Sequence, residues 1–309
     1  MNFRNYHLSK VLINIIDPGL LNIVKFNLTK TDRTMILQSF RPPADLLPFI
    51  SRYLYGYTNF SGTFCSQSIP RGFPALMVIM TDSDEEMIEV IQPRMAQALT
   101  NGVFLFGQGT QIWWSNISIK QAFMVVLNPK SLPIILKDSA STITDRVIRV
   151  DEIWPGCRFL PEQLRDQKSQ FARLNILDTF LRQLFREKTP KTDEVEGAIN
   201  RIFNLSGQVR VNELAAYERI SIRSLTRKFN EKVGMSPKQY ARVIRFRALM
   251  NYILRHPEIC WLDITYQFGY YDQAHFIKDF QQMTGNSPSQ YLGLDQSFDG
   301  LFIKILSAY

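Results

Sequence analysis

The chain has 309 residues, of which 45% are hydrophobic, 21% charged and 12% aromatic. This length and composition exclude a largely disordered chain and predict a soluble globular protein of two domains. The net charge of +8 suits an anionic partner such as nucleic acid, although charge alone does not select one. The apolar runs stop short of the roughly 18 residues that a membrane span requires, so we expect no membrane association.

Cysteine and histidine are scarce and scattered. Cys65, Cys157 and Cys260 are odd in number and form no C-x-x-C pair, which predicts a reducing cytoplasm rather than a disulfide framework. The three histidines form no H-x-H or H-E-x-x-H motif. The sequence therefore predicts neither a metal site nor a cofactor, and it offers no catalytic residues.

The segment 1–165 has the texture of a β-rich domain. Short runs of β-branched and aromatic residues are separated by Gly, Pro, Asn and Asp, and they include "FSGTFCSQSI", "PALMVIM", "EMIEVIQ", "GVFLFGQGTQIWW" and "ISIKQAFMVVL". Many short strands with frequent turns predict a β-sandwich or a small barrel rather than a βαβ sheet.

The segment 166–192 predicts an amphipathic helix followed by a linker. An apolar stripe at helical spacing is formed by Leu177, Phe180, Leu181 and Leu184. The stripe has two equal interpretations, pairing with a second subunit in a homodimer or packing on the chain's own sheet. The polar run "REKTPKTDE" that follows predicts the linker.

One phrase occurs twice in the last third of the chain, as "GMSPKQY" from Gly234 and as "GNSPSQY" from Gly285. The copies lie fifty-one residues apart, and the matching extends upstream to Leu225 with Phe276 and Phe229 with Phe280. An internal repeat of this kind predicts the same local structure built twice.

Each copy predicts a helix, a turn, a second helix and then a capped third helix. Ser221 in the first copy and Asp272 in the second stand where an N-cap side chain accepts hydrogen bonds from free amides. The glycine ends the second helix, and the following Ser-Pro begins the third, because proline is tolerated at the first helical position. The sequence therefore predicts two helix-turn-helix units within an all-α domain over 193–293, followed by a tail over 294–309.

The second helix of the first copy has one apolar and one polar face. Ile222, Leu225, Phe229 and Val233 are expected on the apolar face, and Arg227 is expected opposite them. An apolar back with an arginine-rich front is typical of a recognition helix in the major groove, where arginine can bond guanine O6 and N7 together.

The third helix of the first copy predicts a rigid connector over 236–255. Twenty residues at about 1.5 Å each span roughly 30 Å. Successive major-groove faces of DNA lie about 34 Å apart, so the connector can hold two recognition helices near successive grooves.

These motifs, "LAAYERISIRSLTRKFNEKVGMSPKQY" and "ITYQFGYYDQAHFIKDFQQMTGNSPSQY", resemble the DNA-binding domain of AraC/XylS-type transcriptional regulators over about residues 193–293. The resemblance implies a sequence-specific regulator that binds promoter DNA beside RNA polymerase in the cytoplasm, and that is not an enzyme.

The resemblance also implies which residues contact DNA. Base-reading positions correspond to Arg223, Thr226 and Arg227 in the first recognition helix and to Gln273, His275 and Lys278 in the second. Ser224 is a further DNA-binding candidate on the polar face of the first helix. Phosphate-contacting positions correspond to Ser221, Lys228 and Lys238. Asp279 departs from this pattern and is expected to repel DNA, so the second unit is expected to contribute positioning more than readout.

The first domain resembles the cupin-like sensor domains that precede many such DNA-binding domains. The resemblance implies a small-molecule effector site or a dimerisation surface. Phe104, Phe106, Trp113 and Trp114 are candidates for an apolar pocket, with plain core packing as the alternative.

Two other functions are left open by the residues. The first domain can bind a protein instead of a metabolite. A DNA-repair alkyl-transfer enzyme is a remote alternative, but it needs an activated cysteine, usually within a metal-binding cluster, and no such cluster is present.

Overall fold

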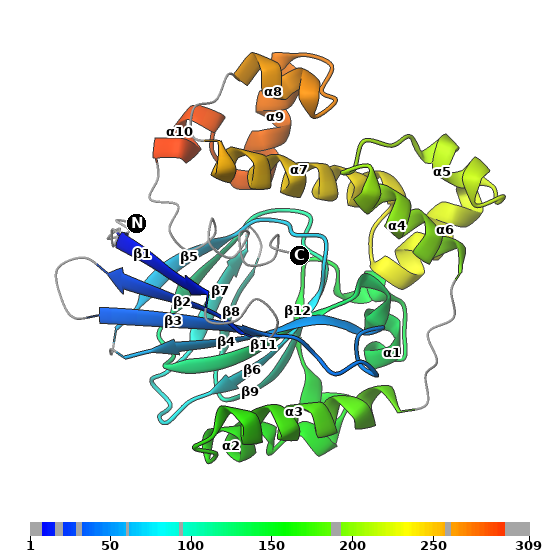
Figure 1. Cartoon of the computed structure of the whole chain (residues 1–309). Helices are drawn as coiled ribbons and strands as arrows, with labels where there is room; N and C mark the ends of the chain where they lie inside the picture. Colours follow the sequence, from blue (N-terminus) through cyan, green and yellow to red (C-terminus); the bar gives the residue numbers. More distant parts are fainter. Residues whose placement is uncertain are drawn as a thin grey trace.

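A computed structural model of the chain describes residues 8–15, 21–28, 33–59, 62–92, 95–186, 193–256 and 261–293. The expected linker over 187–192, the tail over 294–309, His7 and Cys260 lie outside these described residues. Strands fill the first half of the described chain and helices the second (Figure 1). This arrangement confirms the predicted fold class, a β-rich domain followed by an all-α domain.

Two antiparallel sheets form the first domain. The larger sheet has the strand order β1-β2-β3-β4-β11-β6-β9-β12, and the smaller has the order β5-β10-β7-β8. The strands of the larger sheet are β1 (Leu8–Ile15), β2 (Leu21–Leu28), β3 (Arg33–Phe40), β4 (Ile50–Thr58), β6 (Ala75–Met80), β9 (Gly102–Phe106), β11 (Gln121–Leu127) and β12 (Val147–Arg149). Those of the smaller sheet are β5 (Phe64–Ser68), β7 (Ile88–Gln92), β8 (Met95–Leu99) and β10 (Trp113–Ile117).

The two sheets pack face to face as an open sandwich. Ile79 and Phe104 of the larger sheet share one apolar cluster with Val90, Leu99 and Trp113 of the smaller sheet. Side chains alternate along each strand, so Trp113 is buried in this cluster while Trp114 is 36% exposed on the other face of β10. This alternation sets which aromatic residues can reach the interior.

Two helices, α2 (Leu160–Arg165) and α3 (Gln170–Phe185), cover the outer face of the larger sheet (Figure 1). Leu177, Leu181 and Leu184 are buried in the same cluster as the sheet residue Tyr53. The Tyr53 hydroxyl donates a hydrogen bond of 2.7 Å to the buried Asp178 of α3. The stripe predicted on this helix therefore packs on its own domain, and it is not a free surface for a second subunit.

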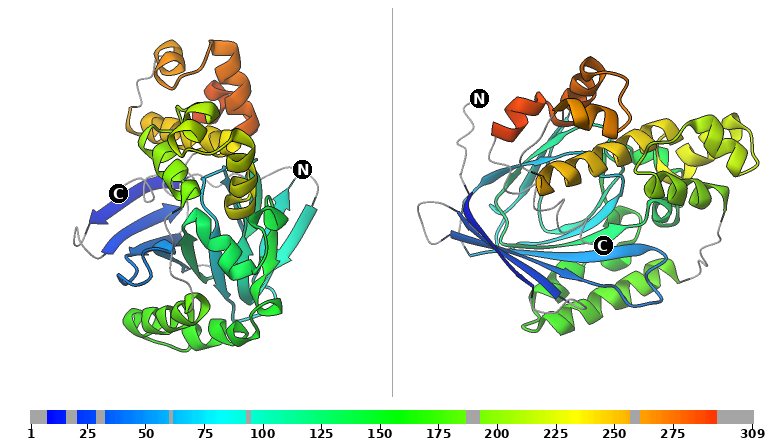
Figure 2. Two further views of the ribbon diagram at one scale, coloured as in Figure 1. Left: turned by 90° about the vertical axis from the view of Figure 1, so that its right-hand side faces the viewer. Right: turned by 45° about the horizontal axis from the view of Figure 1, so that its top comes forward.

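The second domain contains seven helices within the described residues. They are α4 (Glu194–Asn204), α5 (Val211–Tyr217), α6 (Ile222–Val233), α7 (Pro237–Arg255), α8 (Trp261–Gln267), α9 (Gln273–Thr284) and α10 (Pro288–Gly293). Their apolar faces meet in a single core that includes Ile202, Leu225, Phe246 and Phe280. Figure 2 shows that these helices lie on one side of the sheets, with α2 and α3 on the other.

The repeat is longer than the motifs indicate. At the same offset of fifty-one residues, Val195 of α4 corresponds to Phe246 of α7 and Ile202 corresponds to Ile253, and all four side chains are buried in the helical core. The second half of α7 therefore has the position in the second copy that α4 has in the first. One long helix both ends the first unit and supports the second.

The two domains are in direct contact. The Tyr240 hydroxyl of α7 donates to the Gly72 carbonyl at 3.1 Å, and Thr144 Oγ1 donates to the Gly234 carbonyl at the end of α6. Lys130 and Glu196 form an ion pair of 2.7 Å across the same interface. No helix within the described residues is long and apolar enough to cross a membrane.

Candidate DNA-binding surface

Each helix-turn-helix unit turns through one residue with positive φ. In the second unit this residue is Gly269, with φ of +68°. In the first unit the corresponding residue is Arg219, with φ of +56°. Glycine adopts this left-handed conformation without strain, whereas an L side chain disfavours it. The two units therefore share one turn geometry although their turn residues differ.

The N-terminus of each recognition helix is capped by the predicted residue. Ser221 Oγ accepts a hydrogen bond of 3.1 Å from the Ser224 amide at the start of α6. Asp272 Oδ1 accepts a hydrogen bond of 2.7 Å from the His275 amide at the start of α9. These caps satisfy amides that have no partner inside the helix, and they fix where each helix begins.

The repeated phrase G-x-S-P-x-Q-Y ends one helix and begins the next. Gly234 and Gly285 end α6 and α9 with φ of +91° and +74°. Ser236 begins α7 in a reciprocal capping box with Gln239, and Ser287 and Gln290 exchange the same pair of hydrogen bonds at α10.

The structure assigns roles to two more residues of this phrase. The glutamine completes the capping box, and its position three residues after the serine is the sequence signal for that role. The tyrosine is a core residue, because Tyr240 and Tyr291 are both buried in the helical core.

The recognition helix α6 has a buried back and a charged front. Leu225, Phe229 and Val233 are fully buried, as predicted, but Ile222 is 51% exposed and does not belong to the core. The first helical residue lies beyond the edge of the packed surface, which is why the helical spacing alone misplaced it.

The front of α6 presents the predicted base-reading arginines to solvent. Arg223 and Arg227 are exposed, and Arg227 forms an ion pair of 2.8 Å with Glu231 one turn later. An exposed i,i+4 pair of this kind contributes only about 0.3–0.5 kcal/mol, so a nucleic acid can displace it. Ser224 and Thr226 are half-buried beside this front, while Ser221 and Lys238 are exposed at helix starts.

Lys228 lies on the flank of α6 that faces α4. Its ammonium group is 2.8 Å from the Glu194 carboxylate, and the next turn repeats the contact with Lys232 and Asp193 at 2.6 Å. Hydrogen bonding from Lys228 is the main cause that lowers the pKa of Glu194. Burial opposes ionisation of Asp193, but hydrogen bonds from Lys232 and from the Glu196 amide outweigh it and lower the pKa of that carboxyl. Lys228 therefore ties two helices together in this structure.

The recognition helix α9 presents all three residues that the resemblance implies. Gln273, His275 and Lys278 are all exposed to solvent. Asp279 is different from the expectation, because its side chain is only 5% exposed and it faces α7. It is ion-paired with Arg242, lies 3.8 Å from Arg245 and accepts a hydrogen bond of 2.8 Å from Tyr270. The prediction that Asp279 repels DNA is therefore wrong.

Corresponding ion pairs join each recognition helix to its supporting helix, with the signs of charge exchanged. Lys228 of α6 pairs with Glu194 of α4, and at the same offset of fifty-one residues Asp279 of α9 pairs with Arg245 of α7. The cation is on the recognition helix in the first unit and on the supporting helix in the second. The repeat preserves the contact while it exchanges the residues that make it.

The four aromatic residues predicted for a pocket are not in one place. Phe106 and Trp113 line a cavity between the two sheets. Phe104 is 3% exposed in the sandwich core and has the Arg149 guanidinium 5.5 Å from its ring centroid. Trp114 lies on the outer face of β10. Only two of the four therefore border the cavity.

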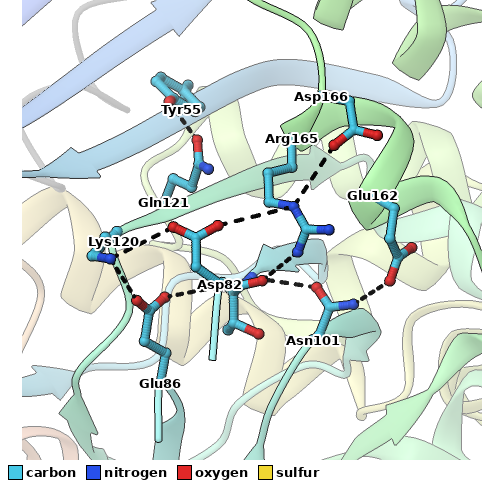
Figure 3. Close-up of polar contacts among 10 residues, drawn as sticks. Tyr55, Asp82, Glu86, Asn101, Lys120, Gln121, Glu162, Arg165 and Asp166 are labelled. Atoms are coloured by element: carbon cyan, nitrogen blue, oxygen red, sulfur yellow. Dashed lines mark hydrogen bonds and ion pairs between the residues drawn. The ribbon is translucent and has the colours of Figure 1, made fainter. Parts of the chain in front are cut away.

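A polar cluster at the edge of the sandwich holds α2 to the strand ends (Figure 3). Lys120 lies 3.1 Å from Glu86 and 3.5 Å from Asp82, and Arg165 of α2 donates a hydrogen bond of 2.5 Å to the Thr81 carbonyl. These carboxylates are paired with cations. No group of three or more acidic, histidine or cysteine residues in the described parts of the chain can hold a metal ion.

The two described cysteines do not have the environment of an activated thiol. Cys157 is buried, and burial raises its pKa to about 11. Burial also raises the pKa of the exposed Cys65. Since the thiolate is the nucleophile, both environments oppose alkyl transfer to cysteine.

Comparisons with known proteins identify the class of the helical domain. Residues 214–293 match the family described as "Helix-turn-helix domain", and residues 38–149 match the family described as "Domain of unknown function (DUF6597)". Residues 214–293 of the helical domain therefore match a helix-turn-helix domain, in agreement with the resemblance seen in the sequence.

Curated relatives are similar to about a third of this chain. The transcriptional activator RhaR of Salmonella dublin is 29% identical over 31% of this chain and 34% of its own length. RhaS of Escherichia coli is 29% identical over 28% of this chain and 30% of its own length. This chain thus matches about a third of the length of these relatives.

Solved structures show a more distant likeness. An apo variant of ToxT from Vibrio cholerae has a TM-score of 0.43 at 14% identity, over 78% of this chain and 97% of its own. The xylose-binding transcription activator xylR has a TM-score of 0.29 at 17% identity, over 40% of this chain and 38% of its own.

Proposed function

We propose that this protein is a sequence-specific DNA-binding transcriptional regulator whose two helix-turn-helix units bind successive major grooves of promoter DNA. One observation carries the proposal: the front of each recognition helix bears an exposed cation at the same position of the repeat, Arg227 in α6 and Lys278 in α9. Both helices are anchored by a fully buried back, so the charged fronts are held in fixed orientation.

The connector α7 supports the same proposal. Its 19 residues span about 28 Å at 1.5 Å per residue. This length is close to the separation of roughly 34 Å between successive major-groove faces. Because α7 is packed into the core along its length, it fixes the separation of the two units.

The residues proposed to read bases are Arg223, Ser224, Thr226 and Arg227 in the first unit and Gln273, His275 and Lys278 in the second. Ser221 and Lys238 are proposed to contact phosphates at exposed helix starts. For Lys228 the ion pair with Glu194 favours a supporting role, so DNA contact by this residue requires that pair to open.

The test is specific DNA binding by the full chain, with fragments selected from genomic DNA. Arg227→Ala should weaken the selected site by about 1–3 kcal/mol and relax preference at one base pair, because a bidentate arginine–guanine contact is lost. Arg158→Ala is the matched control, since Arg158 is an exposed arginine of the first domain. Failure of the full chain to prefer any fragment would contradict the proposal.

The second unit needs its own measurement. Lys278→Ala should weaken binding and also relax sequence preference if α9 reads bases, whereas equal weakening on specific and random DNA would show that α9 only positions the protein. Both variants are measured by fluorescence anisotropy against the selected and a shuffled fragment.

The proposed role places the protein in the cytoplasm beside RNA polymerase, without a catalytic activity of its own. The first domain is proposed to sense a small molecule, because a cavity lies between its two sheets. A homodimer would have to use a surface other than the apolar stripe of α3, which is buried.

A protein partner for the first domain is the competing proposal. Native mass spectrometry of the purified chain separates the two, because a retained small molecule favours an effector and a retained protein favours the partner.

A further inference from the structure

The loop 205–209, which joins α4 to α5 in the first unit, is held by its own backbone. The Gly207 amide donates to the Ile202 carbonyl at 2.8 Å, and the Ser206 amide donates to the Phe203 carbonyl at 2.9 Å. Ser206 and Gly207 both have positive φ, of +49° and +75°. Together these features form a Schellman motif at the end of α4, which satisfies carbonyls that have no partner inside the helix. The backbone of this loop is therefore fixed relative to α4.

The same loop packs closely on the middle of the connector α7. A Cβ on Gly207 would lie 2.2 Å from the Ala241 carbonyl oxygen and 2.4 Å from the Arg245 amide nitrogen, so this approach leaves no room for a side chain. The second unit packs on the same part of α7, where Arg242 is ion-paired with Asp279 of α9. The two units therefore meet at the middle of α7.

The side chain of Gln208 crosses from the first unit to the second. Its Nε2 donates a hydrogen bond of 3.1 Å to the carbonyl of Gln267, the last residue of α8. Its Oε1 would lie 3.0 Å from a Cβ on Gly269, so the side chain lies against the turn between α8 and α9. Gln208 thus links the loop of the first unit to the turn that precedes the second recognition helix.

The last four carbonyls of α8 show what this hydrogen bond supplies. Carbonyls at the end of a helix have no acceptor role inside it and need donors from elsewhere. Three of them accept from amides of the following turn, and they belong to Ile264, Thr265 and Tyr266. The fourth, at Gln267, accepts from Gln208. The first unit therefore completes the C-terminal cap of a helix in the second.

This contact also accounts for a difference between the two turns. The residue with positive φ is Arg219 in the first turn and Gly269 in the second. Three side-chain atoms of Gln208 lie within 4 Å of the position that a Cβ on Gly269 would take. Arg219, in contrast, is exposed, so the first turn has room for a long side chain. Glycine in the second turn leaves room for Gln208.

Gln208 completes a second connection between the two recognition helices. The first connection is α7, which follows α6 and packs against α9. The second runs from α6 to α4 through the ion pair of Lys228 with Glu194 at 2.8 Å, along α4 to the loop 205–209, and through Gln208 to the turn before α9. Two connections restrict the rotation of one unit relative to the other more than one connection does.

We propose that Gln208 is a positioning residue that fixes the orientation of α9 relative to α6 and thereby selects the spacing between two half-sites, the stretches of DNA that the two units contact. This inference rests on the proposed function, since spacing matters only when both units bind one duplex. One inserted base pair moves the second half-site by about 3.4 Å and rotates it by about 35°. Units held at two points follow that displacement less readily than units held by α7 alone.

The contact between Gln208 and Gln267 is tested first, without DNA, by hydrogen exchange of the full chain. Gln208→Ala removes the donor and should speed exchange at least threefold in the turn 268–270. Gln208→Glu keeps the length of the side chain but cannot donate when ionised, so it should give the same increase. Gln163→Ala is the matched control, because Gln163 is an exposed glutamine of α2, and it should leave this turn unchanged. Unchanged exchange in both Gln208 variants would overturn the contact.

The role in spacing is tested by fluorescence anisotropy with a selected fragment and two derivatives, one with a base pair inserted between the half-sites and one with a base pair removed. The original chain should bind each derivative at least tenfold more weakly than the selected fragment. In Gln208→Ala this penalty should be at least threefold smaller, whereas Gln163→Ala should keep the full penalty. A general loss of stability would weaken binding to all three fragments alike, so it would not reproduce this result.

Two results would overturn the role in spacing: equal penalties in Gln208→Ala and the original chain, or equal affinity of the original chain for all three fragments. If the original chain prefers no fragment over random DNA, the proposed function itself fails and the role in spacing fails with it. The exchange measurement contains no DNA, so it decides the contact between the units in either case.

Discussion

At the residue scale, Asp279 shows how a charge can be misassigned from sequence. It stands one position after the exposed Lys278, and the sequence suggests a charge near DNA. In the structure its carboxylate is buried and held by Arg242, Arg245 and Tyr270. A rotation of about 100° per residue separates the two neighbours, which is enough to turn one to solvent and the other to α7.

Removal of this carboxylate should destabilise the helical domain. Asp279→Ala leaves two arginines beside a buried site without their anion, which should lower the free energy of unfolding by about 3–5 kcal/mol. Asp279→Asn should cost less, because the amide oxygen still accepts a hydrogen bond. Urea denaturation followed by circular dichroism measures both variants. The exposed neighbour provides the control, since Lys278→Ala should stay within about 0.5 kcal/mol of the original chain; similar losses at both positions would contradict the burial argument.

At the element scale, capping and turn residues predicted the helices better than residue patterns predicted the strands. The caps at Ser221, Asp272, Gly234 and Gly285 act between near neighbours, so the sequence alone located both helix-turn-helix units. Strand β4 shows the opposite case, because both faces of the sheet are covered there and its consecutive residues 53–55 are all buried. The period-two alternation that marks a half-exposed strand is then lost, so the sequence pattern does not identify this strand.

The turn of the first unit offers a stabilising substitution. Arg219 is exposed and has φ of +56°, whereas its counterpart in the second unit is Gly269. Arg219→Gly should raise the free energy of unfolding by roughly 0.5–1 kcal/mol, because the relief of left-handed strain exceeds glycine's extra entropy in the unfolded chain. Thermal and urea unfolding give the value.

The matched control for this turn is Ala216→Gly in the preceding helix α5. Ala216 is exposed and helical, so glycine there should lower stability by about 0.5–1 kcal/mol. Opposite signs at the two positions are expected. A loss of stability at both positions would show that the turn gains nothing from glycine.

At the scale of the whole molecule, the contact between the domains joins the cavity to the recognition helices. The interface combines the buried Ile69, the hydrogen bond from Tyr240 to Gly72 and the ion pair between Lys130 and Glu196. These residues are far apart in sequence, and none carries a local signal of its partner. The proposed communication between effector and DNA depends on this interface.

Gly72→Ala should loosen the interface without unfolding either core. Gly72 has φ of +77°, and an added Cβ would lie 2.5 Å from Ile244 Cδ1, so the substitution should destabilise the contact by about 1–2 kcal/mol. Hydrogen exchange should become faster in 69–73 and in the first half of α7. Gly156→Ala is the control, because a Cβ there meets nothing within 4 Å. Unchanged exchange in Gly72→Ala would show that the domains are held elsewhere.

The sequence by itself determined the class of the helical domain and most of its helix caps and turns. Caps and turns depend on interactions within a few residues, and here they occur in both copies of an internal repeat. Fold class and the exposed front of each recognition helix followed from the same local patterns. The sequence also marked residues 1–165 as β-rich, because strand composition needs no knowledge of partners.

Only the tertiary structure decided which side chains share a site. It assigned Asp279 and Lys228 to helix–helix contacts, brought Phe106 and Trp113 but not Phe104 or Trp114 to the cavity, and packed the stripe of α3 on its own sheet. Strand pairing and domain contact join residues that are tens of positions apart, and helical or strand periodicity gives only the face on which a side chain lies. What that face meets is fixed by packing, and here packing placed Ile69 and Gly72 of the first domain against α7.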